Sequence, residues 1–131
     1  MPDLCTYSYT IIRVVPRVER EEFVNVGVIV SCPDQKFLEA KIDVDERRLM
    51  ALDPALDIAF VRAHLAAIPL ICAGGKQAGP IEHLSQRERF YWLSATRSTI
   101  IQVSPVHTGL CQDPAITLKS LLDTMVRPSL L

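Results

Sequence analysis

The sequence predicts an α+β fold in which a small antiparallel β-sheet of about four strands, starting with an N-terminal hairpin, packs with three to four α-helices. Three observations lead to this prediction. Two stretches rich in β-branched residues follow each other near the N-terminus, a third stretch alternates apolar and charged residues, and two Asp-Pro pairs precede apolar residues at helical spacing. With 131 residues, of which 49% are hydrophobic, the chain is expected to form a single domain over residues 1–131.

The first three strands are predicted near the N-terminus. Residues 7–15 are rich in aromatic and β-branched side chains and stop at Pro16, which cannot donate a hydrogen bond within a sheet. The polar residues 17–21 are few enough to turn the chain back, so residues 23–32 are expected to complete a hairpin. Residues 37–42 alternate apolar and charged side chains, which is typical of a strand with one face in water.

Two helices are predicted in the middle of the chain. Residues 45–52 have a helical composition. Asp53 is then expected to cap a longer helix, because Pro54 follows it and apolar residues recur at helical spacing. This helix should end or kink near Ile68, because Pro69 lacks the N–H that a helix interior requires.

The remaining elements follow a predicted loop at the glycine-rich residues 74–80. Residues 81–93 are expected to form a helix and residues 98–103 a fourth strand. Asp113 and Pro114 repeat the helix-opening pair, and apolar residues at helical spacing follow them.

Charge argues against a general nucleic-acid-binding role. The net charge of −1 provides no broad positive field to hold a phosphate backbone. Arg87, Arg89, Tyr91 and Trp92 are residue types that bind single strands, but they are too few.

Location and redox state can also be predicted. No apolar run approaches the roughly 20 residues of a membrane span. Residues 1–7 lack the basic start and apolar core of a secretory signal, so a cytoplasmic protein is expected. Cys5, Cys32, Cys72 and Cys111 are far apart and form no Cys-x-x-Cys pair, so we expect small buried side chains, and neither a metal nor a cofactor.

The second strand carries the most informative anomaly, because an amide and a glycine interrupt a run of apolar residues. Strand alternation predicts that the valines at positions 24, 26, 28 and 30 share one core-facing side, with Asn25 and Gly27 on the other. If the hairpin is centred near Glu19, Arg13 lies opposite Asn25. Gly27 would then leave room beside this pair for a backbone or a ligand.

A second group of polar residues lies toward the C-terminus. Arg97 is surrounded by hydroxyl side chains and could hold a phosphate or carboxylate, Gln102 faces the Arg13 side if the fourth strand joins the hairpin, and His107 follows a rigid Ser-Pro turn that could present it for proton transfer. The predicted polar site therefore comprises six residues, Arg13, Asn25, Gly27, Arg97, Gln102 and His107. No catalytic residue is assigned, because no nucleophile motif or phosphate-binding loop is present.

A structural explanation of the same residues is open. Arg13 and Asn25 would then hydrogen-bond within the protein, Gly27 would mark a β-bulge, and Arg97 would cap carbonyls or pair with a carboxylate.

The order of several motifs resembles a known bacterial family. The motifs are Ile-Arg-Val-Val-Pro at 12–16, Glu-Phe-Val-Asn-Val-Gly at 22–27, Arg-Phe-Tyr-Trp-Leu at 89–93 and Ser-Pro-Val-His-x-Gly at 104–109. The chain resembles the family called domain of unknown function 3037 over nearly its full length. The resemblance implies a short cytoplasmic protein, often encoded beside a HipA-like serine/threonine kinase, and no known activity.

Two hypotheses about function follow. The leading one is a non-enzymatic accessory or regulatory protein that binds a protein partner, with a HipA-like kinase as the candidate that the resemblance implies. The competing one is a small ligand sensor or enzyme whose polar pocket takes an anionic or nucleotide-like molecule.

Overall fold

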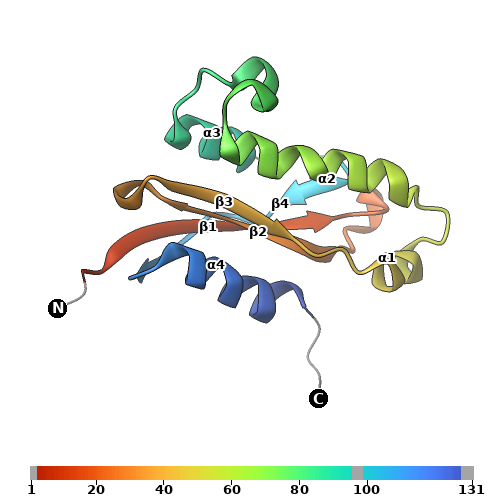
Figure 1. The fold of residues 1–131 in the computed structure, drawn as a ribbon. Coiled ribbons are helices and arrows are strands. Elements are labelled where there is room, and N and C mark those ends of the chain that lie inside the picture. Colours follow the sequence, from red (N-terminus) through yellow and green to blue (C-terminus); the bar gives the residue numbers. More distant parts are fainter. Residues whose placement is uncertain (1–2, 96–98, 128–131) are drawn as a thin grey trace.

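The computed structural model, described over residues 3–95 and 99–127, has an antiparallel five-stranded sheet with helices on both faces (Figure 1). Helices α2 and α3 cover one face and α4 covers the other, so the predicted α+β class is confirmed. The strands are β1 (Cys5–Val14), β2 (Val24–Cys32), β3 (Phe37–Ile42), β4 (Ile101–Val103) and β5 (His107–Cys111). The helices are α1 (Glu46–Leu52), α2 (Ile58–Ala73), α3 (Gln86–Leu93) and α4 (Pro114–Leu121), the last extended by a π-helical turn, Leu122–Val126.

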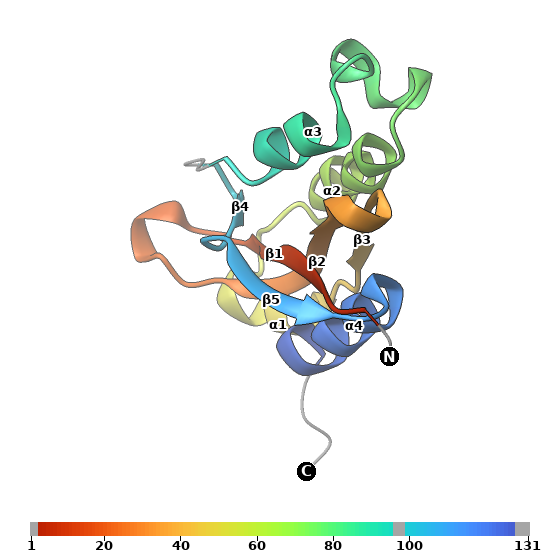
Figure 2. The same ribbon diagram turned by 90° about the vertical axis from the view of Figure 1, so that its left-hand side faces the viewer.

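The sheet has the order β3-β2-β1-β4, and β5 also pairs with β1. Strand β4 pairs with the C-terminal end of β1, and β5 pairs with its N-terminal half. The two strands therefore form one interrupted edge, visible in front of β1 in Figure 2. The predicted turn around His107 was wrong in extent, because only residues 104–106 separate the two strands and His107 begins β5.

A β-bulge interrupts the hairpin. Ile12 pairs with Gly27 but Arg13 pairs with Asn25, so Val26 is an extra residue on β2. The bulge reverses the alternation, and Val24 and Val26 join the core under α2 while Val28 and Val30 join the core under α4. The prediction that these four valines share one face was therefore wrong.

The start and end of α2 also differ from the prediction. The N-cap is Asp57, whose carboxylate accepts a 3.0 Å hydrogen bond from the Phe60 N–H. Asp53 instead follows α1, and its carboxylate accepts from the Ala55 N–H at 3.0 Å. Pro69 lies inside α2, which continues to Ala73. Burial of Ile71 and Cys72 beyond Pro69 stabilises this last part of the helix and offsets the backbone hydrogen bond that is lost at the proline.

Of the other predicted elements, β3 has the predicted bounds, β1 is shifted toward the N-terminus, and α3 and β4 are shorter than predicted. Helix α3 begins at Gln86 after a Ser85–Glu88 capping box, and a 3₁₀ segment, Lys76–Ile81, precedes it. Helix α4 begins behind Asp113, as predicted. The predicted fourth strand is β4, reduced to Ile101–Val103, and residue 98 lies outside the described residues.

Candidate functional site

Asn25, Arg13 and Gln102 lie in a row across β2, β1 and β4, because Arg13 is the register partner of both others. The predicted pairing of Arg13 with Asn25 is thus confirmed. The Arg13 guanidinium lies over the Phe23 ring, 4.1 Å from its centroid. Partial burial lowers the pKa of Arg13 from its ordinary value. No ion pair within residues 3–95 and 99–127 involves Arg13.

Two atoms of this row are buried without a hydrogen-bond partner, Arg13 Nε and Asn25 Oδ1. The Asn25 amide is held on its other side, where Nδ2 donates to the Met125 carbonyl at 3.1 Å. Gln102 Nε2 donates to the Thr99 carbonyl at 2.8 Å. Arg13 Nε is a donor and Asn25 Oδ1 an acceptor, so either a ligand with both functions or a direct bond between them would satisfy the pair.

The presence of glycine at position 27 has a structural explanation that involves no ligand. A Cβ at this position would lie 2.7 Å from the Lys41 carbonyl oxygen of β3. Only glycine lets β3 approach the bulge this closely.

The remaining predicted site residues are not gathered with the row. His107 pairs with Tyr9 and lies 5.3 Å from its ring centroid, and Tyr9 precedes Arg13 by about 13 Å along β1. Alternation places His107 on the same sheet face as Arg13, but in a separate patch. Arg97 lies outside the described residues.

The Ser-Pro break between β4 and β5 is held by buried hydrogen bonds. The Ile11 N–H donates to Ser104 Oγ at 2.8 Å, and Thr10 Oγ1 donates to the Ser104 carbonyl at 2.6 Å. Both hydroxyl side chains are buried. The Ser104–Pro105 pair was visible in the sequence, but its role in joining two edge strands required the pairing to β1.

Arg89, which the sequence grouped with residue types that bind nucleic acids, is a structural residue. It is 7% exposed, and its guanidinium donates to the carbonyls of Ile71 at 2.9 Å, Leu84 at 2.6 Å and Cys72 at 3.4 Å. Two of these carbonyls belong to the last turn of α2, where a cation also interacts favourably with the helix dipole. Arg89 is therefore not available to a nucleic acid.

Three of the four cysteines come together at one end of the sheet. Cys5 and Cys111 are register partners, and burial raises the pKa of Cys32, with smaller increases from the Cys111 and Cys5 thiols nearby. Burial also raises the pKa of the separate Cys72 to about 12. All four thiols are free, and no group of three or more metal-binding side chains occurs among the described residues.

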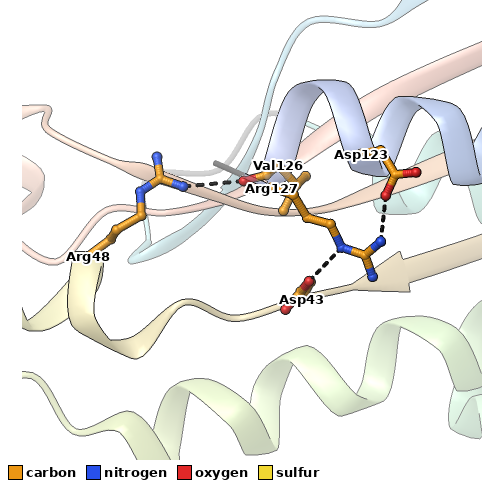
Figure 3. A network of polar contacts seen from close by, with 5 residues as sticks. All are labelled: Asp43, Arg48, Asp123, Val126 and Arg127. Carbon is orange, nitrogen blue, oxygen red and sulfur yellow. Dashed lines mark hydrogen bonds and ion pairs between the residues drawn. The ribbon is translucent and has the colours of Figure 1, made fainter. Parts of the chain in front are cut away.

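A charged network ties the end of α4 to the segment between β3 and α1 (Figure 3). Arg127 pairs with Asp123 and, at 2.8 Å, with Asp43, while Arg48 donates to the Val126 carbonyl at 3.2 Å. Hydrogen bonds to Asp43 and Asp123 raise the pKa of Arg127. Of this network, Asp43, Val126 and Arg127 line a cavity of about 480 Å³, and their polar groups are already bonded within the network.

An apolar groove of about 650 Å³ lies between α2 and β4. We call it the α2–β4 groove. Helix α2 contributes Phe60, His64 and Ile68, β4 forms the opposite wall, and Val18 and Trp92 also line it. Phe60 is 47% exposed and Trp92 41% exposed. Large aromatic side chains open to solvent along a groove are typical of a binding surface.

Comparison with known proteins gives one match. A model of the family described as "Protein of unknown function (DUF3037)" matches residues 9–126. Neither the curated proteins nor the solved structures contain a match to the chain. Within residues 3–95 and 99–127, no helix is long and apolar enough to cross a membrane.

Proposed function

Since the chain belongs to the DUF3037 family, whose description assigns no activity, we propose that it is a non-enzymatic accessory or regulatory protein that binds another protein. The α2–β4 groove is the observation that carries this proposal. A HipA-like serine/threonine kinase in the bacterial cytoplasm is the partner that we propose, following the gene neighbourhood that the family resemblance implies.

The groove has the composition of a protein-binding surface. Its exposed aromatic residues, Phe60 and Trp92, are of the kind that anchor partners when they become buried. Complete burial of one large apolar side chain contributes roughly 1.5–3 kcal/mol. Two such anchors together contribute roughly 3–6 kcal/mol, which only matches the lower estimates of the cost of association, so further contacts along the groove must add to the affinity.

Calorimetry between the full chain and the neighbouring kinase tests the proposal. We expect association at or below tens of micromolar, which corresponds to about 6 kcal/mol. Phe60→Asp should abolish it by placing a charge in the groove. Ile116→Asp is the matched control, because Ile116 is 67% exposed on α4, across the sheet from the groove. An absence of binding, or equal loss in both variants, would contradict the proposal.

A second candidate is a sensor or enzyme for an anionic or nucleotide-like molecule at Arg13, Asn25 and Gln102. The two unpaired atoms of this row favour it. A thermal-shift series with inorganic phosphate and with adenosine monophosphate tests this candidate. A bound anion should raise Tm in proportion to the logarithm of its concentration. The rise should vanish in Arg13→Met and persist in Arg62→Met, which removes an exposed arginine elsewhere. No rise at millimolar concentrations would eliminate the anion site.

A further inference from the structure

We propose that the partner contributes an extended segment that adds to the sheet as a new strand along the outer side of β4, with alternate apolar side chains in the α2–β4 groove. This inference rests on the proposed function, because it names the form in which a protein partner binds.

The first support is the orientation of the β4 backbone. The Val15 N–H donates to the Ile100 carbonyl at 2.6 Å, and the Ser104 N–H donates to the Ile11 carbonyl at 2.8 Å. The backbone N–H and C=O groups of residues 100 and 104 therefore point toward β1. Because the direction of the backbone groups alternates along a strand, the N–H and C=O groups of Ile101 and Val103 point away from β1. Thr99 Oγ1 donates to the Ile101 carbonyl at 2.7 Å. In the described part of the chain, β1 is the only strand that pairs with β4.

The second support is the composition of the described part of this short edge. Proteins usually shield an edge strand with a charge, a proline or a covering element. The three residues of β4 are Ile, Gln and Val, with neither a charge nor a proline among them. An extended peptide can pair with such an edge through its backbone and place alternate side chains in adjoining pockets.

The third support is the position of the groove. The side chains of Ile101 and Val103 lie on the α2 face of the sheet, because their register partners Val14 and Ile12 do. Val14 and Ile12 belong to the core under α2. A strand added outside β4 would extend this same face, so its residues i and i+2 would point at the wall that carries Phe60 and Trp92.

The geometry selects an extended segment over other occupants. A partner helix in the groove would bury its own apolar face there but would form no hydrogen bonds with the outward N–H groups of β4. A small apolar molecule would also form none. A partner strand satisfies the backbone edge and the apolar groove together. The expected segment has apolar residues at alternate positions and no proline where its backbone faces β4.

Random 12-residue peptides displayed on phage, selected against the full chain, provide the probe. We expect the enriched peptides to share apolar residues at i and i+2. One synthetic peptide from the selection is then titrated calorimetrically into four proteins. Binding should weaken at least about tenfold in Val103→Pro, which removes an outward N–H without removing a bond to β1. Phe60→Asp should weaken it at least as much, and Ile116→Asp should leave it unchanged.

Amide hydrogen exchange on the wild-type chain makes the test independent of how well the proline variant folds. The Ile101 and Val103 amides should exchange at least about tenfold more slowly with the peptide bound. Enriched peptides with apolar residues at i, i+3 and i+4, unchanged exchange at these two amides, or no enrichment would overturn strand addition. The kinase titration decides the proposed function separately, because binding that depends on Phe60 without slower exchange at β4 rejects only the strand.

Discussion

Arg89 of α3 is buried against the end of α2 and Arg13 near the end of β1 is partly buried, but their guanidinium groups meet different surroundings. Arg89 donates to three main-chain carbonyls. Arg13 stacks on Phe23, and its buried Nε has no partner. A helix end supplies unpaired carbonyls, whereas the middle of a sheet has none to spare. Pairing at each of its three nitrogens indicates that Arg89 supports the fold, and the unpaired Nε leaves Arg13 open to a further contact.

The largest effect is expected from Arg89→Met. This change keeps an unbranched apolar stem but leaves the carbonyls of Ile71, Leu84 and Cys72 without a donor. We expect the free energy of unfolding to fall by about 3 kcal/mol, because several buried acceptors lose their partners together. Urea unfolding monitored by circular dichroism measures it.

Arg87→Met is the matched control, because Arg87 lies two residues before Arg89 and is exposed on α3. Its effect should stay within about 0.5 kcal/mol. A loss below about 1 kcal/mol in Arg89→Met would show that water replaces the guanidinium and that the end of α2 does not need it.

Gly27 gives the next largest effect, because it allows the bulge that places Arg13 opposite Asn25. In Gly27→Ala the new Cβ meets the Lys41 carbonyl oxygen, a main-chain atom, and we expect a loss of about 2 kcal/mol. In Gly109→Ala the obstruction is the far end of the Tyr7 ring, which can rotate away, so the loss should be smaller. Thermal unfolding of both variants ranks them, and equal losses would mean that β3 also shifts readily.

Local pairing explains what the sequence could predict. The hairpin register was accessible because β1 and β2 are joined by a short connection, so the centre of the turn fixes which residues meet. Caps such as Asp113 act within one turn of a helix and can also be recognised directly. The structural alternative placed a bulge at Gly27, but its effect on the valines was not predicted, because both faces of β2 are buried and a run of valines shows no change when the alternation reverses.

Contacts between distant residues account for the rest. Residues 107–111 are largely exposed and become a strand by pairing with β1, about a hundred positions earlier, which no local pattern indicates. Asn25 and Gln102 came together because both pair with Arg13 of β1. His107 also pairs with β1, but at Tyr9, so it is separated from Arg13 along that strand. The α2–β4 groove and the hydrogen-bond partners of Arg89 depend on how the helices pack on the sheet. The spacing of the contributing residues in the sequence does not predict this packing.

The smallest effect is expected from Arg13→Met, and its size decides what the row is for. Removing the guanidinium loses the stacking on Phe23, worth about 0.5–1 kcal/mol at an exposed site, but it also removes a buried donor without a partner. We therefore expect the free energy of unfolding to change by no more than about 1 kcal/mol in either direction. Added salt should not alter the difference, because the described ion pairs do not include Arg13.

A double-mutant cycle with Asn25→Ala separates a ligand site from internal pairing at the row. If Arg13 and Asn25 bond to each other in solution, the two substitutions will be coupled by about 1 kcal/mol or more. If each is held apart for a ligand, their effects will add within about 0.5 kcal/mol in the absence of ligand, and the Asn25 change will be the larger because it frees the Met125 carbonyl. Strong coupling would make this row part of the scaffold and leave the α2–β4 groove as the functional surface of the chain.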